Sequence, residues 1–290
     1  MIVGYLGPMG TFSQEVAEIY ALRKQCRLKE FFSIQDVILA VHHGEVDEGI
    51  VPIENSLEGS VNVTIDMLVH DVDLYIIDEL VIPVSHCLLA RADTSEADIQ
   101  LILSHAQALG QCRGYLRTHF PKVREQLSLS TAEAARQVAN SREPWAAIAG
   151  RKAGVLFNLK VLAEDIQDHK GNCTRFVVLG STWGRPTGRD KTSIAFTVND
   201  EPGSLLKALE IFANAGINLK KIESRPMRTM LGQYLFLVDL EGHKEDERIS
   251  KYLGILAKES TFYKFLGSYP IGQWKWAGEV KAERKVTSIL

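Results

Sequence analysis

The stretch Gly171-Asn172-Cys173-Thr174-Arg175-Phe176-Val177-Val178-Leu179 joins a polar turn to an apolar run near the middle of the chain. Val177 to Leu179 are β-branched or aliphatic residues, which suit a buried strand. An amide, a thiol, a hydroxyl and a guanidinium stand on the consecutive residues before Phe176. Ligands of open α/β sheets tend to bind at strand ends, which are rigid. The stretch therefore predicts a strand that carries a candidate binding site at its start.

A simpler interpretation of the same residues stays open. Asn172 and Thr174 could make only turn hydrogen bonds, and Arg175 could make a surface ion pair. Taken alone, the stretch favours that interpretation. Three other polar stretches, each between a predicted strand and a predicted helix, favour a site instead.

The first of these stretches follows a strand predicted over residues 1–6. Gly7 to Gly10 predict a turn, and Thr11-Phe12-Ser13-Gln14 has the T-x-x-Q pattern of a capping box that begins a helix. Free backbone N–H groups at a helix start suit an anion such as a carboxylate. The sequence has neither GxGxxG nor GxxxxGK[ST], so we predict no nucleotide site.

The second stretch is Glu54-Asn55-Ser56, at the end of a strand predicted over residues 49–53 and before a helix over about 61–70. Ser56 and Ser60 are possible N-caps of that helix. Successive carboxylate, amide and hydroxyl groups at a strand end also form a hydrogen-bonding cradle. Glu54 is in addition a possible partner of Arg175.

The third stretch begins at Ser104-His105, after a strand predicted over residues 99–103. We predict Ser104 as the N-cap of the next helix. Gln107 and Gln111 stand four residues apart, so they share one face of that helix. They are either solvated or line a cleft.

Strands alternate with helices throughout residues 1–180, which is typical of an α/β sheet. Further helices are predicted at 34–44 behind Ser33, behind the capping box Ser130-Thr131-Ala132-Glu133, and at 150–157. The order of the polar stretches predicts two lobes with a cleft between them. Lobe one comprises residues 1–78 and 160–182, and lobe two comprises 79–159.

Residues 181–191 have no apolar periodicity and predict a linker. The pattern then changes to the order βαββαβ of a ferredoxin-like module. Its strands are predicted at 194–198, 217–225, 233–240 and 262–269, and its helices at 204–215 and 246–258. For the charged tail over residues 271–290, loose order and docking on a partner subunit both stay open.

Composition limits the class of protein. A chain of 290 residues with 46% hydrophobic residues predicts two or three domains with sizeable cores. A net charge of −3 argues against nucleic acid as a partner. We predict no membrane span and no signal peptide, hence a cytoplasmic protein. The four cysteines form no C-x-x-C pair and the histidines no H-E-x-x-H motif, so we predict no metal and no cofactor.

Five motifs together resemble the family of monofunctional prephenate dehydratases that carry a C-terminal ACT regulatory domain. They are Gly7-Pro8-Met9-Gly10-Thr11-Phe12-Ser13, Val51-Pro52-Ile53-Glu54-Asn55-Ser56, Ser104-His105 with Gln107 and Gln111, Asn172-Cys173-Thr174-Arg175-Phe176, and Ile222-Glu223-Ser224-Arg225-Pro226. Each motif is weak alone. All five in this order, over about residues 1–270, are specific.

The resemblance implies a catalytic region over residues 1–182, with two lobes like those of a type II periplasmic binding protein, and an ACT domain over 192–270. It implies conversion of prephenate to phenylpyruvate, water and carbon dioxide on the route to phenylalanine. It also implies feedback control by L-phenylalanine bound between the ACT domains of paired subunits, and hence a homodimer or homotetramer. We expect no fused chorismate mutase.

By the same resemblance, Thr174 is the proton donor to the leaving hydroxyl. Candidate substrate-binding residues are Thr11, Asn55, Ser56, Ser104, Gln107, Gln111, Asn172 and Arg175. Arg175 either clamps a substrate carboxylate or forms a structural ion pair that supports Thr174. Candidate effector-binding residues are Gly203, Ser204, Leu205, Leu206, Glu223, Ser224, Arg225 and Pro226. Ser204 and Leu206 replace the alanine and valine of the family's Gly-Ala-Leu-Val motif.

Three other functions remain open from the sequence. An arogenate dehydratase would use the amino-acid analogue of prephenate. A non-catalytic sensor would join a binding cleft to an amino-acid-binding module, but it would have no need of Thr174. An α/β protein with helix caps alone would explain Thr11, Ser33 and Ser130, but not Glu54-Asn55 or Asn172 to Arg175.

Overall fold

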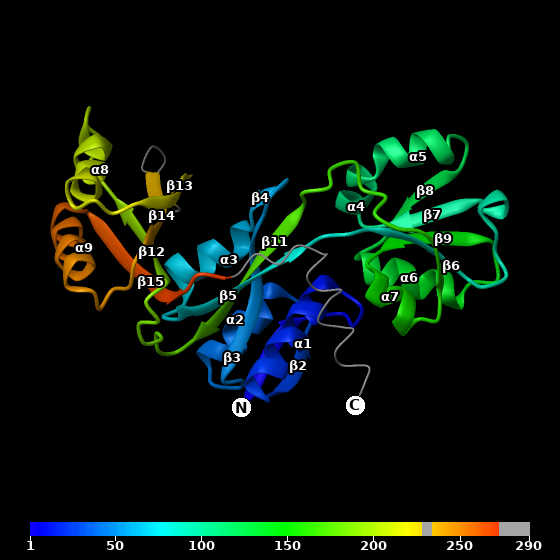
Figure 1. Ribbon diagram of the computed structural model, residues 1–290, viewed down its shortest axis with the longest axis horizontal. Helices are drawn as coiled ribbons and strands as arrows, with labels where there is room; N and C mark the ends of the chain where they lie inside the picture. The colour runs from blue at the N-terminus through cyan, green and yellow to red at the C-terminus, as the bar shows by residue number, and fades with distance from the viewer. Residues whose placement is uncertain (228–233, 273–290) are drawn as a thin grey trace.

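The computed structural model describes residues 1–227 and 234–272. Within them the chain forms three sheets, two in the lobes and one in the C-terminal domain (Figure 1). The start of the strand predicted at residue 233 and nearly all of the predicted tail lie outside the described residues. No helix in the described ranges is long and apolar enough to cross a membrane.

The sheet of lobe one has the strand order β2-β1-β3-β11-β5, with the short strand β4 paired to β3. Its strands are β1 (Ile2–Leu6), β2 (Arg27–Phe31), β3 (Glu48–Asn55), β4 (Gly59–Ser60), β5 (Tyr75–Pro83) and β11 (Cys173–Gly180). Its helices are α1 (Phe12–Lys24), α2 (Ile34–His42) and α3 (Asn62–Asp66), and a π-helical segment (Met67–Asp71) follows α3.

The helices of lobe one begin where their caps predict. The Thr11 side chain accepts a hydrogen bond from Gln14 N at 3.3 Å, and Ser33 accepts one from Asp36 N at 3.0 Å. These bonds satisfy N–H groups that have no partner inside the helix. Helix α3 is different, because its N-cap residue Val61 makes no side-chain cap bond. The possible caps Ser56 and Ser60 are therefore not used.

The sheet of lobe two has the order β10-β6-β9-β7-β8. Its strands are β6 (Cys87–Ala90), β7 (Leu101–Ser104), β8 (Arg124–Leu127), β9 (Trp145–Ala149) and β10 (Lys160–Ala163). Its helices are α4 (Ala106–Gln111), α5 (Arg113–His119), α6 (Thr131–Asn140) and α7 (Arg151–Leu156), with a 3₁₀ turn at Glu96–Asp98. Ser130 caps α6 by accepting from Glu133 N at 3.0 Å, as its motif predicts.

The structure moves both predicted lobe boundaries. Strand β5 stays in the first sheet as far as Pro83, and β10 joins the second sheet. Hydrophobic periodicity predicts that a strand exists but not which sheet it joins, so it could not place these boundaries. The chain crosses between the lobes at residues 84–86 and 164–172. The two crossings are bonded to each other, because Ile166 N donates to the His86 carbonyl at 3.1 Å and Val84 N to that of Asn172 at 2.8 Å.

The C-terminal domain has the predicted order βαββαβ. Its elements are β12 (Asp190–Thr197), α8 (Ser204–Asn214), β13 (Leu219–Pro226), β14 (Tyr234–Glu241), α9 (Glu247–Glu259) and β15 (Phe262–Pro270). They form an antiparallel sheet of order β13-β14-β12-β15. Helices α8 and α9 cover one face through Phe212 and Leu256. The other face packs on lobe one, where Leu237 and Leu266 share a core with Leu68 (Figure 1).

Candidate active site

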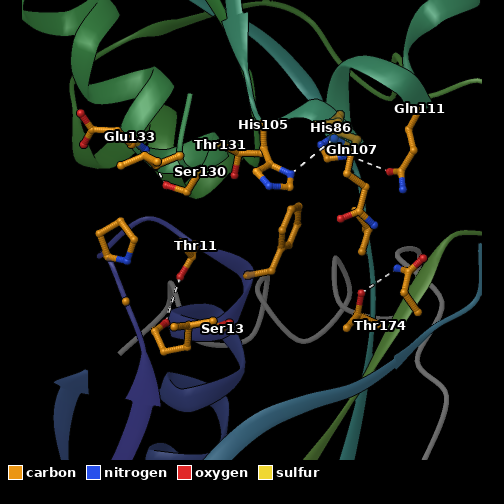
Figure 2. A pocket seen from close by; sticks show the side chains of 18 of the residues that line it. Thr11, Ser13, His86, His105, Gln107, Gln111, Ser130, Thr131, Glu133 and Thr174 are labelled. Carbon is orange, nitrogen blue, oxygen red and sulfur yellow. Dashed lines mark hydrogen bonds between the residues drawn. The ribbon is translucent and has the colours of Figure 1, made fainter. Parts of the chain in front are cut away.

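A cavity of about 710 Å³ lies between the two lobes and is lined from both (Figure 2). Lobe one contributes the segments around β1 and α1 and the end of β3, and lobe two contributes the starts of α4 and α6. The polar lining residues are Thr11, Ser13, Glu30, Asn55, His86, His105, Gln107, Gln111, Ser130, Thr131, Glu133, Arg136, Asn172 and Thr174. The structure thus brings together Thr174 and five of the predicted substrate-binding residues.

Thr174 stands beside Asn55 in the pairing of β11 with β3. Asn55 Oδ1 accepts hydrogen bonds from the backbone N–H groups of Leu57 and Glu58 at 3.0 and 3.1 Å, which fixes the orientation of its amide. Its Nδ2 group therefore donates to Thr174 Oγ1 at 2.9 Å. A threonine hydroxyl carries a single hydrogen. Because the Thr174 oxygen accepts the hydrogen bond from Asn55, the hydrogen of the Thr174 hydroxyl is free to point into the cavity.

A chain of amides extends from Asn55 across the cleft. Asn55 Nδ2 also donates to Asn172 Oδ1 at 2.9 Å. Asn172 Nδ2 in turn donates to Gln111 Oε1 at 3.0 Å. Asn172 lies just before β11, and Gln111 ends α4 in lobe two. The chain therefore joins the predicted proton donor in lobe one to the opposite wall of the cavity.

Arg175 does not line the cavity. Its guanidinium donates to Glu79 Oε2 at 2.8 Å, to Asp239 Oδ2 at 2.7 Å and to the Tyr269 hydroxyl at 2.7 Å. Glu54, its predicted partner, accepts at 3.3 Å. Successive residues of a strand face opposite sides of the sheet, so Arg175 points away from the side that Thr174 faces. Of the two alternatives for Arg175, this geometry favours the structural ion pair.

Two predicted substrate-binding serines also lie outside the cavity wall. Ser104 is fully buried at the end of β7, and its hydroxyl donates to the Ile148 carbonyl at 2.6 Å. The predicted cap at Ser104 is wrong, because the N-cap of α4 is His105. Ser56 accepts from Cys173 N at 2.9 Å and thus holds the turn beside β11.

Sequence reasoning missed several lining residues. His86 comes from the first crossing, where it is buried, and burial lowers the pKa of its imidazole although a hydrogen bond to Gln111 opposes the shift. Ser130 and Thr131 carried only a capping signal. Arg136 is paired with Glu133 at 2.7 Å on the lip of the cleft. Arg136 lies one helical turn after the capping box at the start of α6, and this spacing could have indicated that it lines the cavity.

No group of three or more His, Cys, Asp or Glu side chains in residues 1–227 and 234–272 is arranged to hold a metal ion. The site instead offers amides, hydroxyls and the backbone N–H groups at the starts of α1 and α6. Such groups bind carboxylates and oxyanions.

A second cavity, of about 480 Å³, lies in the C-terminal domain. Ser204 and Leu205 line it, together with Met227 and Tyr234. Gly203, in the left-handed conformation (φ 87°), is the N-cap residue of α8. The other predicted effector-binding motif, Glu223 to Pro226, lies elsewhere, because its charged residues contact lobe one.

Two residues of that motif, Glu223 and Arg225, bind the region around α3. Arg225 donates to Asn62 Oδ1 at 2.6 Å and to Asp66 Oδ1 at 2.8 Å. The Glu223 carboxylate accepts from the Ser60 hydroxyl. The stretch from Glu223 to Pro226 thus contacts lobe one, and the next residue, Met227, lines the second cavity.

Family models match the chain in two places: the prephenate dehydratase model over residues 3–183 and the ACT domain model over residues 192–251. A bifunctional chorismate mutase/prephenate dehydratase of Aquifex aeolicus is 44% identical over 92% of this chain and 73% of its own length. A prephenate dehydratase of Lactococcus lactis subsp. cremoris is 42% identical over 93% of this chain and 98% of its own length.

The fold is also similar to a solved structure, that of a prephenate dehydratase from Arthrobacter aurescens in complex with L-Phe. The TM-score is 0.87 at 33% sequence identity, and the match covers 100% of this chain and 99% of that chain. The first family model covers well over half of the chain, and both relatives match most of it. The chain therefore belongs to the prephenate dehydratase family and carries an ACT domain in its C-terminal part.

Proposed function

We propose that the protein converts prephenate to phenylpyruvate, water and carbon dioxide in the cavity between the lobes, with Thr174 as the proton donor. The observation that carries this proposal is the hydrogen bond from Asn55 Nδ2 to Thr174 Oγ1. It leaves the threonine hydrogen free to be donated on the cavity side.

The chemistry requires little acid strength. As the bond between the ring and its hydroxyl breaks, the leaving oxygen takes a proton and departs as water. The electron pair of the ring–carboxylate bond enters the ring as carbon dioxide leaves, and the ring becomes aromatic. A threonine hydroxyl is a weak acid, so its contribution depends on alignment with the leaving oxygen. The fixed Asn55 amide provides that alignment.

The remaining lining residues would hold the two carboxylates and the keto group of prephenate, all of them hydrogen-bond acceptors. Side-chain donors are available at Thr11, Gln107, Gln111 and Asn172. The starts of α1 and α6, whose first backbone N–H groups have no partner inside the helix, line the cavity from opposite lobes. A dianion that bridges the lobes would thus meet donors on both sides.

For regulation, we place L-phenylalanine in the cavity of the C-terminal domain, beside Ser204 and Leu205. Three observations support this: the family's ACT domain, the L-Phe complex of the Arthrobacter relative, and a cavity at the predicted motif. The paired subunits that such a site requires would form a dimer or a tetramer.

The test is formation of phenylpyruvate from prephenate by the purified full chain, with and without L-phenylalanine, and with arogenate in parallel. Turnover of prephenate that L-phenylalanine suppresses is the expected result. Faster turnover of arogenate would instead assign the amino-acid analogue as substrate. A folded protein that turns over neither substrate would contradict the proposal.

A further inference from the structure

His86 lies between the lobes and contacts both of them. It lies in the first crossing, and its backbone is bonded to the second, since its N–H donates to Gln167 Oε1 at 2.9 Å and its carbonyl accepts from Ile166 N at 3.1 Å. Its ring and that of Phe12 of lobe one pack edge to face, with centroids 5.9 Å apart and planes at 77°. On the other side, its Nε2 atom lies 3.0 Å from Gln111 Oε1 of lobe two (Figure 2).

The neighbours of His86 determine which ring nitrogen carries the hydrogen. The backbone N–H groups of Leu57 and Glu58 fix the Asn55 amide, and Asn55 fixes Asn172. Asn172 then donates to Gln111 Oε1, so this atom is an oxygen that accepts. An accepting oxygen at 3.0 Å requires a donor, and His86 Nε2 must therefore be protonated.

The other ring nitrogen supports the same assignment. His86 Nδ1 is buried and has no hydrogen-bond partner among the described residues. A hydrogen on it would be a buried donor without an acceptor, which is costly. Burial also lowers the pKa of this imidazole. The ring is therefore neutral, with its hydrogen on Nε2.

We propose that His86 is a positioning residue for the dehydration: its Nε2–H group holds the Gln111 amide with the NH₂ group turned to the substrate cavity. Gln111 Oε1 accepts from both His86 and Asn172, so both of its lone pairs are used on the side of the two crossings between the lobes. The NH₂ group is left to face Glu58 Oε1, at 3.5 Å, and the cavity. There it donates to an acceptor of prephenate. The inference rests on the proposed function, because it concerns the same substrate.

Two variants of nearly equal size test the role of the donor. His86→Met removes it, and His86→Gln keeps an N–H group near the position of Nε2. We expect His86→Met to lower kcat/KM by about tenfold, the effect of one lost hydrogen bond at the site. His86→Gln should stay within about threefold of the wild type. Thermal unfolding of both variants serves as the control for folding.

The effect must also depend on Gln111. In a Gln111→Ala background, where there is no amide to position, His86→Met should cause no further loss of kcat/KM. Equal losses for His86→Met and His86→Gln, an undiminished loss in the Gln111→Ala background, or wild-type kcat/KM for His86→Met would each overturn the proposal. An inactive wild type would instead refute the proposed function, so the two failures are distinguishable.

A measurement on the wild-type chain keeps the proposal testable if the variants do not fold. Long-range ¹H–¹⁵N spectra of the ¹⁵N-histidine-labelled protein should show, at neutral pH, a neutral His86 ring protonated at Nε2. The buried His243 ring also has its donor at Nε2, because its Nδ1 accepts from Glu245 N and its Nε2 faces the Gly184 carbonyl, so the two signals must be told apart. Gln111→Ala, which leaves the His86 ring in place but removes its partner at Nε2, assigns the signal by the shift that it causes. A ring protonated at Nδ1, or at both nitrogens, would contradict the inference.

Discussion

Thr174 and Arg175 are neighbours in the chain but serve different parts of the molecule. Strand β11 turns Thr174 to the cavity and Arg175 to the C-terminal domain, because successive side chains of a strand point to opposite faces. Thr174 meets Asn55 on one face, and Arg175 meets Asp239 and Tyr269 on the other. A single strand therefore joins the proposed proton donor to the ACT domain.

At the residue scale, the proposed role of Thr174 as proton donor gives a sharp prediction. Thr174→Ala should lower kcat by about a hundredfold or more and change KM little, because the hydroxyl acts on the transition state rather than on binding. Thr174→Ser keeps the hydroxyl and should retain most of kcat. Steady-state assays of phenylpyruvate formation measure both constants. A near-normal kcat for Thr174→Ala would remove the assignment.

Asn55 offers a second test, because it orients the Thr174 hydroxyl. Asn55→Asp replaces the donating NH₂ group by an oxygen of equal size, which accepts the hydrogen that Thr174 should give to substrate. We expect kcat to fall by about a hundredfold. Asn158→Asp, in an exposed turn after α7, is the control and should leave kcat unchanged. Wild-type kcat for Asn55→Asp would show that the amide does not direct this hydroxyl.

At the scale of elements, local signals predicted most helices and strands. Thr11, Ser33 and Ser130 cap α1, α2 and α6 because each is a small polar residue at the start of an apolar periodic segment. Strand β2 was missed, because its charged sequence at the sheet edge resembles a surface loop. Edge strands of this kind bury little apolar surface.

The candidate site was predictable where residues follow strand ends, and unpredictable where it depends on tertiary pairing. Asn55 could be found by that rule, and Gln111 by the helix face that it shares with Gln107. His86 belongs to no sequence motif, because its place in the site depends on contacts with the second crossing, which is distant in the sequence. Strand alternation also bears on the two alternatives for Arg175, since it places this side chain on the opposite face from Thr174.

The packing of β15 on β5 depends on one glycine and yields an element-scale prediction. Gly267 has φ 143°, and a Cβ atom there would lie 2.2 Å from the Ile76 carbonyl oxygen of β5. Gly267→Ala should therefore lower the free energy of unfolding by at least about 2 kcal/mol, through backbone strain and a clash with backbone atoms. Chemical denaturation measures the change.

Gly254 is the matched control for this substitution. It lies within α9, and a Cβ atom there would meet nothing within 4 Å. Gly254→Ala should stabilise the chain by about 0.5–1 kcal/mol, since alanine favours a helix over glycine. If Gly267→Ala were as stable as Gly254→Ala, the close approach of the two strands would be refuted.

At the scale of the whole molecule, a buried network of charges joins the ACT domain to the catalytic lobe. Asp239 of β14 binds Arg175 of β11 at 2.7 Å, and Lys191 of β12 binds Glu79 of β5 at 2.7 Å. Burial alone would raise the pKa of the Asp239 carboxyl. The charges of Arg175 and Lys191 outweigh burial, so this pKa lies below its ordinary value.

Asp239→Asn tests whether that network stabilises the assembled domains. At neutral pH the variant should lose about 3 kcal/mol of unfolding free energy, because it leaves the charge of buried Arg175 partly uncompensated.

The folded chain binds a proton at Asp239 less readily than the unfolded chain does. The stabilisation is therefore complete above the ordinary pKa of 3.8 and is lost as pH falls through the lower folded-state value. The denaturation curves of the two proteins should thus differ fully at about pH 5 and draw together as pH falls below about 4. The exposed pair of Arg91 and Asp93 provides the control, since Asp93→Asn should leave the curve unchanged at either pH. A constant difference across this range would mean that the Asp239 side chain acts by its shape and not by its charge.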